Sequence, residues 1–223
     1  MSASLVGSEM CIRDRSKEEL KKQEEELKKI EENRPTSRSS YFGIVDLAGF
    51  PKDRYYLYQS RWMPDYPMVH ILPHWNFENK KGENIPVFVY SSGDEVELFL
   101  NGKSLGKKQK QAFEYRFRWN EVPYEPGELK AVAYKDGKVW AEASVKTTGA
   151  PVKLKLTSDK KILKSDGEDL IFVRVSVLDA DGNEVPTAEP LIKATLDGPG
   201  KIVATDNGDP TCLIPFPETT RPA

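Results

Sequence analysis

The feature that most restricts the fold is an alternation of apolar and polar residues through the middle third of the chain. In the segment VELFL every second side chain is apolar, which places Val96 and Leu98 on one face of an extended strand. Asn101-Gly102 and Asp136-Gly137 separate runs of this kind, and such dipeptides are typical of two-residue hairpin turns. Short strands with turns at these intervals predict an antiparallel, immunoglobulin-like β-sandwich at residues 67–149.

A second run of alternation begins after Gly149 and Pro151. The segment LIFVRVSVLDADGNEVP combines a strand pattern with a hairpin turn at Asp181-Gly182. Residues 150–223 provide about 70 residues, against roughly 100 in a complete sandwich of this type. The sequence therefore predicts a mainly β protein with two tandem immunoglobulin-like sandwiches, the second of them incomplete.

Two segments of different composition precede the sandwiches. Residues 16–33 are rich in lysine and glutamate, and Ser16 with Glu19 forms a capping box, so we expect a charged helix. Its thin apolar seam favours a solvated helix, and oligomerisation through this helix stays open as an alternative. Residues 34–66 include an aromatic-rich segment after Pro51 with the pattern of an amphipathic helix, whose apolar face needs a partner.

Charge and hydropathy exclude two classes of partner. The formal net charge is −2 and the basic residues are scattered, whereas a nucleic-acid-binding surface needs a cluster of them. No apolar run approaches the roughly 18 residues of a membrane-spanning helix. We therefore expect a soluble protein that binds neither nucleic acid nor membrane.

No metal site and no cofactor site are expected. Cys11 and Cys212 are the only cysteines, too few for a disulfide framework or a zinc cluster. His70 and His74 have no further ligand residues at suitable spacing. The oxygen-bearing side chains of segment 206–209 (Asp206, Asn207 and Asp209) favour a turn over a calcium site, which requires six or more ligands.

Five sequence blocks carry a resemblance to a known enzyme family. They are YFGIVDLAGFPKDRYYLYQSRW, VHILPHWNF, VELFLNGKSLG, VPYEPGELKAVAYKDGK and ATDNGDPT. In this order and spacing they resemble the C-terminal third of bacterial glycoside hydrolase family 2 enzymes of the β-galactosidase kind. The resemblance implies that residues 34–66 are the C-terminal remnant of a (β/α)8 catalytic barrel. The two sandwiches would then be C-terminal domains that follow this barrel.

The resemblance also implies where catalysis takes place. Retaining glycosidases use two carboxylates about 5–5.5 Å apart, and in this family both lie on barrel strands that would precede residue 34. Two Asn-Glu pairs are similar to the family's acid/base motif, but Asn120-Glu121 falls in a predicted sandwich strand and Asn183-Glu184 in a hairpin turn. We therefore expect no catalytic residue in this chain.

Three residues are expected to lie near substrate in an intact parent enzyme. Asp46 falls in the segment that resembles the loop after the eighth barrel strand, on the face where barrels carry their active sites. His74 and Trp75, in LPHWN, belong either to the rim of the sugar pocket or to an aromatic plug between the barrel and the first sandwich.

The sequence is compatible with two functions. The first is a non-catalytic C-terminal accessory region of a family 2 enzyme acting on β-galactoside-type glycans. This region would itself be inactive, would have the missing barrel as its partner, and would meet oligosaccharide only in the intact enzyme. The alternative is a tandem β-sandwich carbohydrate-binding or adhesion module, which would present a coplanar row of exposed aromatic residues. The candidates for such a row are Trp62, Trp75, Trp119 and Trp140.

The first 15 residues fit neither function. SLVGSEMCIRDR lacks the apolar core of a signal peptide and resembles the translation of a sequencing-library adapter. We expect residues 1–15 to be a disordered artefact without function. The compartment of the protein is therefore open, and a periplasmic or secreted location follows only by analogy with the family.

Overall fold

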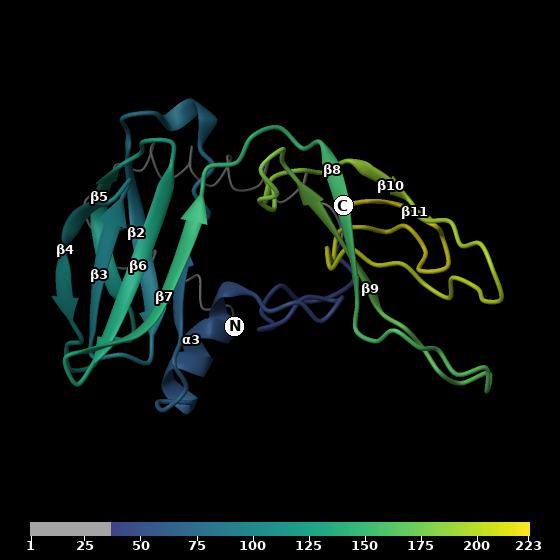
Figure 1. Cartoon of the computed structure of the whole chain (residues 1–223), viewed down its shortest axis with the longest axis horizontal. Coiled ribbons are helices and arrows are strands. Elements are labelled where there is room, and N and C mark those ends of the chain that lie inside the picture. The colour runs from purple at the N-terminus through teal and green to yellow at the C-terminus, as the bar shows by residue number, and fades with distance from the viewer. Residues whose placement is uncertain (1–36) are drawn as a thin grey trace, which may run out of the picture. The chain divides into compact units, whose positions relative to one another are not determined.

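A computed structural model of the chain describes residues 37–223 (Figure 1). The expectations for the adapter-like segment 1–15 and for the charged helix 16–33 lie outside the described residues. Among the residues that the structure describes, no helix is long and apolar enough to cross a membrane. The helices and strands named below all belong to one compact unit, residues 40–210 with 214–223.

Seven antiparallel strands form the first sandwich (Figure 1). One sheet has the strand order β1-β2-β5 and the other the order β4-β3-β6-β7. The prediction of a mainly β chain with an immunoglobulin-like sandwich is confirmed, because a constant-type immunoglobulin domain also divides seven strands between two sheets. The strands are β1 (Val69–Leu72), β2 (Asn84–Ser91), β3 (Glu95–Leu100), β4 (Lys103–Gln109), β5 (Phe117–Pro123), β6 (Glu128–Lys135) and β7 (Lys138–Lys146).

The two hairpin turns have the backbone conformation that their sequences predict. Asn101 and Gly102 join β3 to β4 with φ angles of 49° and 80°. Asp136 and Gly137 join β6 to β7 with φ angles of 51° and 73°. Positive φ at both central residues defines a type I′ turn, whose twist matches that of the flanking strands.

The core of this sandwich follows the alternation in the sequence. Val96 and Leu98 of β3 are completely buried, whereas the intervening Glu97 is partly exposed. Val87 and Val89 of β2 belong to the same buried cluster and come from the other sheet. Burial of each such aliphatic side chain stabilises the fold by about 1.5–3 kcal/mol.

A helix, α3 (Asp53–Trp62), packs on the outside of strands β1 and β2. The Tyr56 ring stacks on the His70 ring of β1 with centroids 3.9 Å apart, and His70 Nε2 lies 2.8 Å from Asp53 Oδ1. Another part of the helix surface carries Tyr58 and Trp62, whose rings stack at 4.8 Å. Trp62 is 73% exposed, so the expected amphipathic helix is present and part of its aromatic surface is uncovered.

Residues 150–223 form two small sheets of two strands each. β8 (Lys153–Ser158) pairs with β9 (Val173–Leu178), and β10 (Leu191–Lys193) pairs with β11 (Thr220–Pro222). The register of the first pair sets Leu156 opposite Val175, and both side chains are exposed. This region therefore has fewer paired strands and a less buried apolar surface than the first sandwich.

We expect the two regions to differ in hydrogen exchange. Amide groups of β2, β3 and β6 should exchange most slowly, because these strands are each paired on two sides and enclose the buried core. Amide groups of β8 and β9 should exchange faster, since each strand has a single partner. Exchange monitored by mass spectrometry checks this order, and uniformly strong protection across residues 150–223 would contradict it.

Candidate functional site

Asp46 lies in a tight turn that its own carboxylate stabilises. Asp46 Oδ1 accepts the Phe50 backbone N–H at 2.8 Å, and the backbone N–H of Asp46 donates to the Phe50 carbonyl at 2.9 Å. A Cβ atom added to Gly208 would lie 2.4 Å from Asp46 Oδ2, so the backbone of segment 206–209 approaches this carboxylate closely. In the described residues, Asp46 therefore organises a turn.

Trp75 lies in the core of the first sandwich. Its side chain is 0% exposed, and its indole N–H donates to the Glu125 carbonyl at 2.9 Å. The Tyr124 ring packs edge-on at 5.1 Å, and Thr147 Oγ1 donates to the Trp75 carbonyl at 2.6 Å. Trp75 is therefore an aromatic plug that closes one end of the sandwich core. Because it is fully buried, it offers no free ring face to a sugar in this structure.

His74 is exposed beside this plug. Its ring stacks on Phe77 at 4.9 Å, and its Nδ1 accepts the backbone N–H of Asn76 at 3.2 Å. Asp46 belongs to a separate turn, and its hydrogen bonds are made with Phe50 and not with His74 or Trp75. These three candidates therefore do not form one site within the described residues. Their proximity to substrate in a longer enzyme stays a prediction.

The glutamates of the two Asn-Glu pairs occupy exposed positions. Glu121 is an exposed residue of β5. Glu184 follows the turn after β9, and its Oε1 accepts a hydrogen bond from Arg174 Nη2 at 2.7 Å. Asn120-Glu121 lies in the strand that the sequence predicts, and Asn183-Glu184 lies at the end of the predicted turn, where Glu184 pairs with Leu178 in a β-bridge. Neither pair lines a cavity found in the described part of the chain.

Segment 206–209 forms a turn in which the side chains bind its own backbone. Asp206 Oδ1 accepts the Gly208 N–H at 3.1 Å, and Asn207 Oδ1 accepts the Asp209 N–H at 3.2 Å. Within residues 37–223, no group of three or more His, Cys, Asp or Glu side chains is arranged to hold a metal ion.

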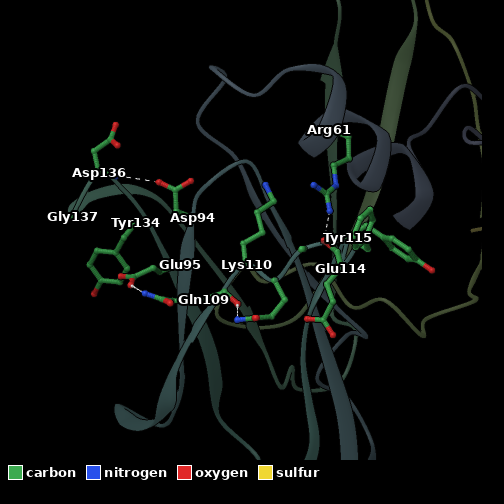
Figure 2. Close-up of a pocket in the computed structure, with 13 residues that line it drawn as sticks. Arg61, Asp94, Glu95, Gln109, Lys110, Glu114, Tyr115, Tyr134, Asp136 and Gly137 are labelled. Carbon is green, nitrogen blue, oxygen red and sulfur yellow. Dashed lines mark hydrogen bonds between the residues drawn. The ribbon is translucent and has the colours of Figure 1, made fainter.

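A cavity of about 940 Å³ lies at the other end of the first sandwich (Figure 2). The connections β2–β3, β4–β5 and β6–β7 meet there because the strands are antiparallel, and the Trp75 plug follows β1 at the opposite end. Helix α3 contributes Arg61 to the wall. The polar and aromatic lining includes Asp94, Glu95, Lys110, Glu114, Tyr115 and Tyr134.

Two carboxylates of this cavity, those of Glu95 and Asp94, have partners within the protein. Glu95 accepts hydrogen bonds from Gln109 Nε2 at 2.9 Å and from Lys107 Nζ at 3.4 Å, and the pKa of its carboxyl is lowered chiefly by the bond from Gln109. Asp94 Oδ2 accepts the backbone N–H of Asp136 at 3.2 Å. A glycosidase general acid needs a raised pKa, so Glu95 is unsuited to that role.

The positively charged side chains of this cavity, Arg61 and Lys110, are less well neutralised than its carboxylates. The Arg61 guanidinium donates to the backbone carbonyl of Glu114, which carries no formal charge. The pKa of the Lys110 ammonium is lowered because of its burial and, secondarily, the nearby positive charge of Arg61. No sequence pattern indicates this site, because its residues come from separate segments around positions 61, 94, 110 and 135 and form no local motif.

Two family models match the chain. Residues 82–141 match a domain of unknown function, DUF4982. Residues 154–223 match the glycoside hydrolase family 2 C-terminal domain 5. The first model covers most of the first sandwich, and the second covers the region of strands β8–β11.

Curated relatives extend these matches toward the N-terminus. The chain is 48% identical over 188 residues to the β-galactosidase BoGH2A of Bacteroides ovatus, a match that covers 84% of this chain and 22% of the relative. It is 44% identical to a putative β-glucuronidase of Formosa agariphila, with 75% of this chain and 16% of that protein covered. The chain thus spans about a fifth of the length of these relatives.

Two solved structures agree with the sequence matches. The crystal structure of a β-glycosidase from Bacteroides vulgatus superimposes with a TM-score of 0.80 at 37% identity, covering 84% of this chain and 24% of that protein. A β-glucuronidase of glycoside hydrolase family 2 superimposes with a TM-score of 0.71 at 31% identity, covering 81% of this chain and 19% of the enzyme. The chain therefore belongs to glycoside hydrolase family 2 and corresponds to the C-terminal region of its enzymes.

Proposed function

We propose that the chain is a non-catalytic accessory region of a family 2 enzyme that acts on β-galactoside-type glycans, and that it is inactive by itself. The observation that carries this proposal is the match to a β-galactosidase at 48% identity over only 22% of that relative's length. The exposed positions of Glu121 and Glu184 add support, because catalytic carboxylates need a shared, substrate-sized site.

The contacts between α3 and the first sandwich fit one accessory role, the support of a catalytic barrel. The ring stack of Tyr56 on His70 and the pairing of Asp53 with His70 hold α3 against the first sandwich. The exposed Tyr58–Trp62 pair of the same helix is then free to contact further barrel elements. In this proposal the sandwich fixes the last barrel helix, and the barrel is the partner of the chain.

The proximity of Asp46, His74 and Trp75 to substrate belongs to the same proposal. The exposed ring of His74 is available for contact with a glycan or a barrel loop, whereas the buried Trp75 acts by holding the backbone of His74 in place. Asp46 acts by fixing the turn that precedes α3.

The alternative, a carbohydrate-binding module with a planar aromatic row, has less support. Trp75 and Trp119 are 0% and 6% exposed, so they cannot form a surface platform. The indole N–H of Trp140 donates to Ser92 Oγ at 2.8 Å, and Lys135 Nζ lies 4.6 Å from its ring centroid. Among these four tryptophans, all of which the structure describes, Trp62 alone is largely exposed.

Segment exchange in the Bacteroides ovatus relative tests the support role. Deletion of the part of that enzyme that matches residues 67–223 should lower both its melting temperature and its turnover of an aryl β-galactoside, because the last barrel helix loses the sandwich on which it packs. Replacing that part with residues 67–223 of this chain should restore both. A deletion variant as stable and active as the complete enzyme would contradict the proposal.

A further inference from the structure

The proposed support of a catalytic barrel does not involve the cavity at the loop end of the first sandwich. At about 940 Å³, this cavity lies within the range of roughly 300–1,000 Å³ that is typical of small-molecule sites. Three inter-strand connections and α3 build it. Immunoglobulin variable domains likewise place their binding loops at one end of a sandwich.

Two cations from different elements converge on this cavity. Arg61 is near the end of α3, and Lys110 follows β4. Among the described residues, the Lys110 ammonium has no hydrogen-bond or ion-pair partner. The lowered pKa of this ammonium shows the cost of holding it partly buried beside Arg61. An anion bound between the two side chains would remove that cost.

The carboxylates that line the cavity do not fill this role. Glu95 is bound by Gln109 and Lys107, and Asp94 by the backbone of Asp136. Figure 2 shows the Glu114 carboxylate directed away from the Lys110 ammonium and the Arg61 guanidinium. The charge of Asp94 favours the charged form of Lys110, but burial and Arg61 outweigh it and the net pKa stays lowered. A carboxylate supplied by a ligand would complete the neutralisation.

Aromatic rings next to the two cations restrict the class of ligand. Tyr115 is 55% exposed and Phe113 is fully exposed, and both line the cavity. Figure 2 shows Tyr115 beside Arg61. A flat apolar ring face suits the C–H face of a pyranose, and the planar guanidinium fork suits a carboxylate.

We propose that this cavity binds a uronic acid residue of an acidic saccharide. Its carboxylate lies between Arg61 and Lys110, and its sugar ring lies against Tyr115. The proposal does not depend on the support role proposed above, because it concerns binding by the first sandwich and α3 alone.

Titration calorimetry on the full chain tests this site, with trigalacturonate, neutral galactotriose and triglutamate as probes. Trigalacturonate should bind at least tenfold more tightly than either of the other two. Lys110→Met and Arg61→Gln should each weaken its binding about tenfold, the size expected for one charged hydrogen bond. Lys103→Met, a change to an exposed lysine at the other end of the sandwich, should leave binding unchanged.

Nuclear magnetic resonance provides a second measurement that needs no substitution. Saturation with trigalacturonate should raise the pKa of the Lys110 ammonium, because a bound carboxylate favours its charged form. If galactotriose bound as tightly as trigalacturonate, the proposed role of the carboxylate would be wrong. If triglutamate bound as tightly as trigalacturonate, the proposed preference for a saccharide would be wrong. Absence of trigalacturonate binding, or binding without a change in the pKa of Lys110, would overturn the site itself.

Discussion

Replacement of Trp75 by alanine is expected to lower the free energy of unfolding of the first sandwich by about 3–5 kcal/mol. The indole is fully buried and packs against Tyr124 at 5.1 Å and against Phe77 at 6.3 Å. Its removal leaves a cavity and also deprives the Glu125 carbonyl of the indole N–H donor. Both effects act in the same direction, so this substitution belongs among the most damaging in the chain.

Urea denaturation followed by far-ultraviolet circular dichroism measures this effect. Trp62→Ala is the matched control, because it removes the same side chain from a position that is 73% exposed. The control should change the free energy of unfolding by no more than about 0.5 kcal/mol. Equal effects of the two substitutions would show that Trp75 is not the core plug described above.

Gly127→Ala is expected to destabilise the same sandwich by about 3–5 kcal/mol. Gly127 has a φ angle of 140°, and an added Cβ would lie 1.9 Å from Asn101 Oδ1. Asn101 joins two loops, since its Oδ1 accepts the Glu128 N–H at 2.8 Å and its Nδ2 donates to the Pro126 carbonyl at 3.2 Å. Displacement of this side chain costs about 1 kcal/mol for each hydrogen bond, and the backbone strain adds about 1–3 kcal/mol.

Gly137→Ala separates the two contributions. Gly137 also has a positive φ angle, 73°, but an added Cβ would meet no atom within 4 Å. Its substitution should therefore cost only the backbone term, about 1–2 kcal/mol. Thermal unfolding of both variants gives the comparison, and a Gly127→Ala variant no less stable than Gly137→Ala would contradict the close packing of Asn101.

The first sandwich was predictable because its signals are local. Alternation of apolar and polar residues fixes which face of β3 is buried, as Val96 and Leu98 show. The Asn-Gly and Asp-Gly dipeptides fix the two hairpin turns, because few other residue pairs adopt positive φ twice in succession. These patterns can be interpreted without knowing which residues far along the chain contact them.

The position of Trp75 was harder to predict for the opposite reason. It lies in an irregular segment between β1 and β2, where no periodicity indicates which side chains are buried. Its partners Glu125 and Thr147 follow it by 50 and 72 residues. The cavity near Lys110 has the same character, because its walls come from segments that only the folded sandwich brings together.

Whether this chain is non-catalytic is decided by incubating the purified chain with 4-nitrophenyl β-galactoside and with 4-nitrophenyl β-glucuronide and measuring the nitrophenol released. We expect no release of nitrophenol above the buffer rate, and the same result for the Glu121→Gln and Glu184→Gln variants. Turnover by the unaltered chain that either substitution abolishes would contradict the proposal that the chain is non-catalytic.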